Sequence, residues 1–267
     1  MRTTLETLFT QIRAENRAAL IAYLPAGFPS QQGCQRAMSV LAEAGVDAVE
    51  IGFPYSDPVM DGPTIQAAAS ISLKNGTGAT EVFSTLNFAH RLGLPAVVMT
   101  YWNPIERYGA DRFAQEILRN GGSGVITPDL TIEESDDWAV ATEAAGINSI
   151  YVVAPSTNDF RLTQVVARCS GFVYAASLMG VTGTRTFISS GARHLVERIR
   201  STTELPIAVG LGVSTRAQAR DVAGFADGVI VGSAFIKVLL DAKSEQSGLL
   251  ELKALAADLV AGVREAR

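Results

Sequence analysis

The sequence predicts a single (β/α)8 barrel, an α/β fold that takes up residues 1–267 as one domain, with an extra N-terminal helix. Three observations predict this fold. Eight short apolar runs lack polar alternation, which is typical of parallel strands covered on both faces. Amphipathic helical stretches separate the runs. The G-x-G-x-x-G turn of a doubly wound sheet does not follow the first run, which continues into Pro25-Ala26-Gly27-Phe28-Pro29.

The expected elements alternate along the chain, because a Gly or Pro that ends a helix precedes each apolar run. A helix over 3–15 would cover the bottom of the barrel, and one over 248–265 would close the outer ring. Strands are expected over 18–24, 48–52, 96–101, 124–127, 149–153, 172–176, 207–209 and 228–231. Further helices are expected over 31–44, 110–120, 133–145, 159–169, 191–201, 215–223 and 235–241. Asn103-Pro104 predicts a turn.

Two connections are longer than the others, and both follow the C-terminal end of an expected strand. One holds residues 54–78 after the second strand, and the other holds residues 180–190 after the sixth. Barrel enzymes place their sites on this face, and long loops in compact domains are usually functional. We therefore expect two long loops that act as lids over one mouth.

Composition restricts the kinds of partner. Hydrophobic residues make up 48% of the chain, and the formal net charge is −5 with acids and bases interspersed, so nucleic acid is not expected as a partner. An anion would have to be bound by local backbone dipoles. The two cysteines, Cys34 and Cys169, fit reduced thiols. No signal peptide or membrane-spanning run is present, so the protein is expected in the cytoplasm.

Glu50 is the clearest candidate for chemistry, because it interrupts the apolar run Val49–Gly52 and charged side chains are rarely buried without a reason. Asp61 follows on a loop that could bring a second carboxylate over it. Each has a simpler alternative. Glu50 could face outward and pair with a helix arginine, and Asp61 could be an ordinary turn residue. Tyr174, in the sixth expected strand, is either a helper of these carboxylates or a packed aromatic.

Glycine-containing turns follow the last three strands and predict a phosphate site. They are Gly180-Val181-Thr182-Gly183-Thr184, Gly210-Leu211-Gly212-Val213-Ser214 and Gly232-Ser233-Ala234. Glycine lets backbone N–H groups approach an anion, and the start of a following helix adds unpaired donors. Each turn alone fits an ordinary strand-to-helix connection, but three in consecutive units converge on one side of the mouth. The short helix over 235–241 would complete the site.

The residue inventory disfavours other chemistries. The only histidines, His90 and His194, fall on helical stretches, which disfavours histidine-based hydrolysis and zinc. None of the four lysines interrupts a strand, so a Schiff-base aldolase is not expected. No acidic cluster has the character of a magnesium site, and no metal is expected. Acid–base catalysis by carboxylates remains.

The residues from Glu50 to Pro58, with Asp61-Gly62-Pro63-Thr64-Ile65-Gln66, resemble the signature of the tryptophan synthase α-subunit family, the indole-3-glycerol-phosphate lyases. The resemblance covers essentially the whole chain. It implies retro-aldol cleavage of indole-3-glycerol phosphate to indole and glyceraldehyde 3-phosphate. It also implies that Glu50 acts as acid and base, that Asp61 accepts the indole N–H hydrogen bond, and that Tyr174 orients Glu50.

The resemblance further implies the binding residues and the partner. Backbone N–H groups of Gly183, Gly212, Gly232 and Ser233 would bind the phosphate, Thr182 would serve loop closure, and Tyr23, Tyr101, Val152 and Leu211 would form the indole slot. The partner would be a β subunit in an α2β2 heterotetramer, contacted by loops 54–61 and 101–107. Pyridoxal phosphate is expected only in that partner, which receives indole through a tunnel, and no cofactor is expected in this chain.

One departure from the family is Leu178, where members often have an arginine, so the closure of the sixth loop and its signalling to the partner stay open. Three alternatives to the function that the resemblance implies also stay open. The chain could be a stand-alone lyase that releases free indole, or another phosphate-binding barrel such as a sugar-phosphate isomerase. It could also be a non-catalytic subunit that only binds indole-3-glycerol phosphate.

Overall fold

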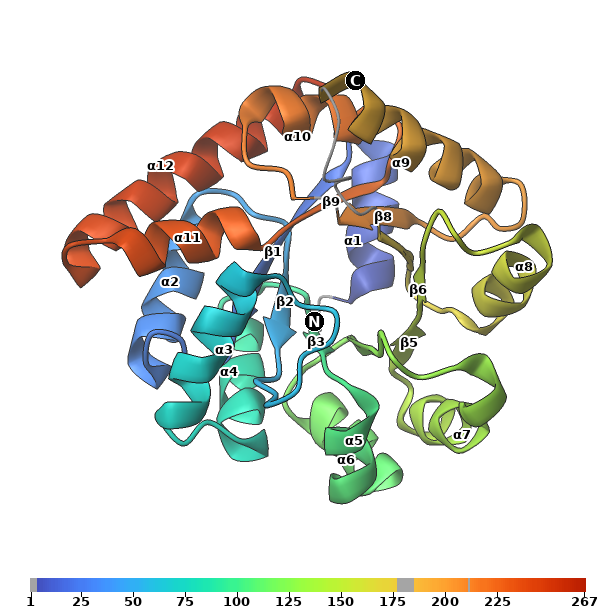
Figure 1. The fold of residues 1–267 in the computed structure, drawn as a ribbon, viewed down its shortest axis with the longest axis horizontal. Coiled ribbons are helices and arrows are strands. Elements are labelled where there is room, and N and C mark those ends of the chain that lie inside the picture. Colours follow the sequence, from blue (N-terminus) through green and yellow to red (C-terminus); the bar gives the residue numbers. More distant parts are fainter. Residues whose placement is uncertain (1–3, 177–184, 211) are drawn as a thin grey trace.

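The protein is a parallel sheet surrounded by helices, as seen in a computed structural model that describes residues 4–176, 185–210 and 212–267 (Figure 1). The side chains of residues 185–190 are outside the description. The strands are β1 (Ala19–Pro25), β2 (Ala48–Gly52), β3 (Ala96–Met99), β4 (Gly124–Ile126), β5 (Asn148–Ile150), β6 (Val152–Val153), β7 (Val173–Ala176), β8 (Ile207–Gly210) and β9 (Gly228–Val231). Every pairing between neighbouring strands is parallel.

The sheet forms a closed barrel because Tyr151 joins its two end strands, β5 and β6. The strand order is β5-β4-β3-β2-β1-β9-β8-β7-β6, so β5 and β6 lie at opposite ends although only Tyr151 separates them in sequence. The strand expected over 149–153 is thus divided into two segments with different neighbours. Strands of a barrel are tilted and staggered, which lets the two halves of one strand face different partners. The predicted barrel is confirmed, with one expected strand divided.

Helices follow most strands and surround the sheet. They are α1 (Leu5–Ala14), α2 (Gln31–Glu43), α3 (Pro63–Lys74), α4 (Ala79–Arg91), α5 (Trp102–Tyr108), α6 (Ala110–Arg119), the 3-10 helix η1 (Ile132–Glu134), α7 (Asp136–Ala145), α8 (Asp159–Arg168), α9 (Arg185–Arg200), α10 (Arg216–Ala223), α11 (Ser233–Asp241) and α12 (Glu245–Arg264). Side-chain oxygens of Ser30, Asn158 and Thr215 accept backbone N–H groups at the starts of α2, α8 and α10. Within the described ranges, no helix is long and apolar enough to cross a membrane.

Helix α1 covers the bottom of the barrel, as expected. In Figure 1 it lies close to the strands rather than in the outer ring. Its buried side chains pack against residues that face the barrel interior, and the rings of Phe9 and Phe172 lie 5.9 Å apart. The contact places one apolar cluster across the end opposite to the carboxyl ends of the strands, which leaves the other end for a site.

Two connections differ from the expectation. The long connection after β2 contains α3, which begins with Pro63 after Gly62. The turn predicted at Asn103-Pro104 is wrong, because these residues lie in the first turn of α5, where proline loses no helical hydrogen bond. The carboxylate of Asp129 accepts hydrogen bonds from Trp102 N, at 2.9 and 3.1 Å, and so caps this helix from the next connection. Local sequence did not reveal that partner.

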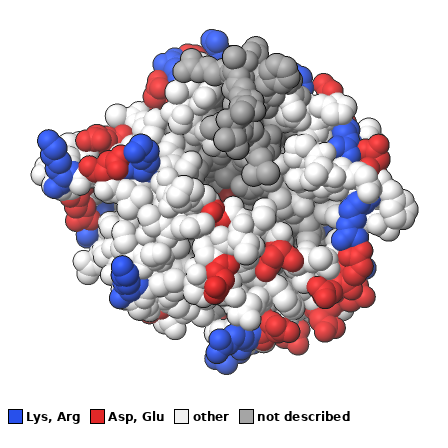
Figure 2. Space-filling view, viewed as in Figure 1, with Lys and Arg blue, Asp and Glu red and all other residues white. Residues whose placement is uncertain are grey.

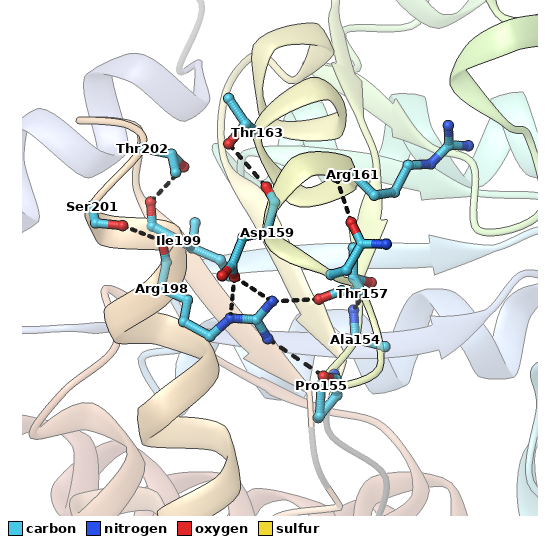
Figure 3. Close-up of polar contacts among 11 residues, drawn as sticks. Ala154, Pro155, Thr157, Asp159, Arg161, Thr163, Arg198, Ile199, Ser201 and Thr202 are labelled. Atoms are coloured by element: carbon cyan, nitrogen blue, oxygen red, sulfur yellow. Dashed lines mark hydrogen bonds and ion pairs between the residues drawn. The ribbon is translucent and has the colours of Figure 1, made fainter.

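Helix α9 begins at Arg185, six residues before the expected start at 191, and the rest of the predicted second lid lies outside the described residues. Arg198 ties this helix to the connection after β6 (Figure 3). Its Nε donates to Asp159 Oδ1 at 2.8 Å, and its guanidinium also donates to the carbonyl oxygens of Pro155, at 3.4 Å, and Thr157. Side-chain contacts therefore hold α8 and α9 together at this point.

Candidate active site

A cavity of about 600 Å³ opens at the carboxyl ends of the strands, the face where barrels place their sites. Its described lining is Tyr23, Glu50, Met60, Asp61, Gly62, Pro63, Thr64, Ile65, Met99, Tyr174, Gly210, Gly212, Ile230, Gly232 and Ser233. Figure 2 shows basic side chains towards the edge of the visible face and acidic side chains both at the edge and nearer its middle. Selectivity for an anion therefore has to come from groups inside the cavity.

The alternation of the strands turns the key side chains inward. Ile21 in β1 and Ala48 in β2 pack in the cluster inside the barrel. Side chains two residues apart on a strand share a face, so Tyr23 and Glu50 also point inward, one step closer to the mouth. The two residues are directly opposite each other in the pairing of β1 with β2. The outward-facing alternative for Glu50 is therefore wrong.

Glu50 is a buried acid with one carboxyl oxygen that has no hydrogen-bond partner in the described part of the chain. The residue is 1% exposed, and its Oε2 accepts no hydrogen bond from the described residues. Burial, and to a lesser degree the neighbouring Asp61, raises the pKa of Glu50 to about 8. A carboxyl with this pKa is mostly protonated at neutral pH, so it can give a proton to a substrate and take one back.

Asp61 lies on the connection between β2 and α3, and it is a turn residue that also faces the cavity. Its backbone N–H donates to Pro58 O at 3.4 Å, and its carbonyl accepts from Gln66 Nε2 at 2.8 Å. Burial raises the pKa of its half-buried carboxyl. The backbone therefore forms a local turn, as the simpler alternative expected, while the side chain joins Glu50 in one cavity.

Tyr101 supports this loop, a role that sequence patterns did not reveal. Its buried hydroxyl accepts a hydrogen bond from Met60 N at 2.9 Å, and its ring lies 5.2 Å from the ring of Tyr55 on the same loop. Burial raises the pKa of Tyr101 to about 12, so the hydroxyl stays neutral. Tyr101 is thus placed behind Asp61 rather than in the described lining of the cavity.

Tyr174 faces the cavity from β7, across the barrel from β2. Its pKa is raised well above the usual value, first by burial and then by Glu50 and Asp61. Its hydroxyl lies over Gly210, where a Cβ atom would come within 2.4 Å of the phenol oxygen. Glycine at this position is therefore what lets the phenol lie across β8. Tyr174 therefore lines the same cavity as Glu50 and Asp61.

The described parts of the glycine turns after β8 and β9 line the same cavity. Gly212 has φ +73°, in the left-handed region that favours glycine. Gly232 is the N-cap of α11, and Ser233 is the first residue of that nine-residue helix. The unpaired N–H groups of this helix start thus face the cavity that contains Glu50. Thr182, Gly183 and Leu211 lie outside the described residues, as does Leu178.

The remaining walls are apolar. Met99, Ile230 and Ile65 line the cavity, and sequence reasoning did not name them although Met99 and Ile230 follow the inward alternation of their strands. Val152, expected in the indole slot, packs against the cluster inside the barrel and is not in the described lining. The cavity therefore combines an apolar wall, two carboxyls and a set of backbone N–H donors.

Other reactive groups in the described part of the chain do not build a competing site. Burial raises the pKa of the Cys34 and Cys169 thiols to about 12, which makes them poor nucleophiles. Among those residues, no three His, Cys, Asp or Glu side chains gather where they could hold a metal ion. The chemistry available here is proton transfer by carboxyls.

The fold and this cavity define a (β/α)8-barrel protein with a buried carboxyl in a cavity at the carboxyl ends of its strands. A family model described as "Tryptophan synthase alpha chain" matches residues 9–264. The chain belongs to the tryptophan synthase alpha chain family, and is thus a subunit of an enzyme of tryptophan synthesis. The family resemblance noted from the motifs is confirmed.

Curated relatives and solved structures agree over nearly the full length. The chain is 54% identical to the tryptophan synthase alpha chain of Streptomyces avermitilis over 253 residues, which cover 94% of this chain and 91% of that protein. It is 50% identical to the alpha chain of Thermobifida fusca, covering 99% of both. An open form of tryptophan synthase from M. tuberculosis superposes with a TM-score of 0.90 at 44% identity, covering 99% of this chain and 100% of that one.

Proposed function

We propose that this chain cleaves indole-3-glycerol phosphate to indole and glyceraldehyde 3-phosphate. The observation that carries the proposal is the buried Glu50 carboxyl, which shares a cavity with Asp61 and whose Oε2 has no hydrogen-bond partner among the described residues. Its pKa, raised to about 8, favours the protonated form at neutral pH. An acid that must also act as a base in one turnover needs a pKa near the working pH, and burial supplies it here.

The cleavage needs two proton transfers. Indole C3 is a poor leaving group until it is protonated, so Glu50 first gives its proton to C3 and the ring becomes a positively charged indolenine. Ionised Asp61 accepts the hydrogen bond of the ring N–H and stabilises that charge. The Glu50 carboxylate then removes the proton from the hydroxyl on the adjacent glycerol carbon. The bond from this carbon to C3 breaks, its electron pair returns to the ring, and the aldehyde forms.

The phosphate and the indole would occupy opposite parts of the cavity. The phosphate is bound by backbone N–H groups of Gly183, Gly212, Gly232 and Ser233. Because the chain has a net charge of −5 and so no overall positive field, these local dipoles have to attract the anion. Thr182 serves closure of the sixth loop. The indole lies against Tyr23 and Leu211, next to the apolar wall of Met99 and Ile230. Tyr101 and Val152 stay in the proposed slot, although neither is in the described lining of the cavity. Tyr174 orients Glu50.

The proposed partner is a tryptophan synthase β subunit, which receives the indole in an α2β2 complex in the cytoplasm and carries the pyridoxal phosphate. Solved relatives from M. tuberculosis are tryptophan synthases. On this chain the loop after β2 exposes Val59 by 80% and Met60 by 51%. Apolar side chains this exposed favour a docking surface, with 101–107 beside it. Size-exclusion chromatography with β at micromolar concentration should give a larger species, and unchanged elution would contradict this part of the proposal.

The direct test is release of glyceraldehyde 3-phosphate from indole-3-glycerol phosphate, measured with and without added β subunit. We expect slow release by the isolated chain and a sharp rise when β is added. Fast release that β does not change would indicate a stand-alone lyase. Substrate binding without release in either condition would indicate a non-catalytic binding subunit. Neither binding nor release would leave a phosphate-binding barrel with another substrate.

A further inference from the structure

We infer that Tyr23 is a positioning residue for this reaction, whose hydroxyl donates a hydrogen bond to the Asp61 carboxylate once a ligand draws the loop after β2 over the cavity. The inference rests on the proposed function and goes beyond it. In the proposed function, Tyr23 is only part of the apolar slot for the indole. Its phenol oxygen also places a hydrogen-bonding group at the mouth of the cavity.

Two glycines leave the space that the ring of Tyr23 occupies. A Cβ atom at Gly52 would lie 2.2 Å from the Tyr23 hydroxyl and 2.6 Å from Cζ, and one at Gly232 would lie 3.2 Å from its Cβ and Cδ1. The missing side chains therefore let the ring start beside β9 and lean across β2. The hydroxyl lies at the level of Gly52, which is the next inward-facing residue of β2 after Glu50. Gly52 is nearer the mouth of the barrel than Glu50. Asp61, on the loop after β2, lines the same cavity.

The hydroxyl is free to make this bond. Within the described part of the chain, no hydrogen bond to the Tyr23 phenol oxygen is formed, while Asp61 and Glu50 line the same cavity. After burial, Asp61 is the strongest influence that raises the pKa of Tyr23, ahead of Glu50, Tyr101 and Tyr174. For Tyr174 the order is reversed, with Glu50 ahead of Asp61. The charge of Asp61 thus acts more strongly on Tyr23, and that of Glu50 more strongly on Tyr174, within the one cavity that all four line.

The bond would serve the chemistry of Asp61. Burial raises the pKa of this carboxyl and favours its neutral form, which cannot stabilise a positive indolenine. A hydrogen bond donated to a carboxylate favours the ionised form and fixes its direction. Among its neighbours, the Tyr101 hydroxyl is held by Met60 N and is not in the described lining of the cavity, and Glu50 is itself an acid that repels a second charge. Tyr23 is therefore the phenol best placed for the task.

The test is a double-mutant cycle on cleavage of indole-3-glycerol phosphate by the complex with β. Tyr23→Phe should lower kcat/KM by about tenfold, because a hydrogen bond to a charged group is lost. In the Asp61→Asn background the same substitution should change kcat/KM by less than about twofold. An equal loss in both backgrounds would overturn the inference. Tyr151→Phe is the matched control, since its buried hydroxyl has no partner among the described residues and lies outside the cavity.

A second measurement does not depend on turnover. The carboxyl 13C shift of Asp61 reports its pKa in the wild type and in Tyr23→Phe, without ligand and with saturating indole plus inorganic phosphate. We expect the Asp61 pKa to rise in Tyr23→Phe when these probes are present. An Asp61 pKa that Tyr23→Phe leaves unchanged in both conditions would overturn the inference. Failure of the wild type to cleave would instead overturn only the proposed function.

Discussion

Glu50 in β2 and the partly buried Asp47 just before this strand are two carboxyls with different surroundings. Asp47, just before the strand, accepts a hydrogen bond from Leu20 N at 2.8 Å and pairs with Arg17 at 2.9 Å, which is the usual state of a structural carboxylate. Glu50 has an oxygen with no such partner. Burial therefore favours the protonated, uncharged form of the Glu50 carboxyl. The proposed reaction uses that proton.

The pH dependence of cleavage should report this proton. Because Glu50 must enter the reaction protonated and its pKa is about 8, kcat/KM should fall as pH rises through about 8, by about tenfold per unit well above it. The measurement is kcat/KM from about pH 6 to about pH 10, with circular dichroism as a control for the fold. A kcat/KM that rises through this range would show that the ionised form starts the reaction.

At the scale of elements, the loop after β2 owes its position to a residue on the next connection. Tyr101→Phe removes the acceptor for Met60 N and should loosen the loop that carries Asp61. We expect kcat/KM to fall by about fivefold, the effect of one neutral hydrogen bond, and the Met60 amide to exchange faster. Kinetics and hydrogen exchange measure the two effects. Tyr55→Phe, which keeps the ring contact, is the control, and unchanged exchange at Met60 would contradict this role.

Among these elements, the sequence predicts the local features but not the contacts between distant segments. Short apolar runs predict the strands, and a carboxylate inside one of them singles out Glu50, although the sequence left open whether its side chain faces inward. Contacts between distant segments were not predictable, because no local pattern encodes them. Asp129 caps α5 across 27 residues, and so Pro104 was mistaken for a turn. Tyr101 reaches Met60 across 41 residues, and the division of the fifth strand at Tyr151 depends on the stagger of the barrel.

For the whole molecule, stability and chemistry are separated between the two ends of the barrel. The bottom is closed by α1, and the cavity lies at the other end. Phe9→Ala should lower the free energy of unfolding by about 3 kcal/mol, because it leaves a hole against Phe172, while kcat stays close to that of the wild type. Denaturant unfolding and kinetics measure both. Phe160→Ala, at a side chain 77% exposed, is the control and should change stability by less than about 0.5 kcal/mol. An equal effect of both substitutions would contradict this division.

The central claim is that one buried carboxyl carries both proton transfers. The most direct measurement is release of glyceraldehyde 3-phosphate from indole-3-glycerol phosphate by Glu50→Gln in complex with β. Glutamine keeps the shape of the neutral acid but has no proton to give, so release should fall by about 10²- to 10⁴-fold or more. The melting temperature and binding to β should stay near those of the wild type. Substantial turnover by a folded, β-bound Glu50→Gln protein would contradict the account.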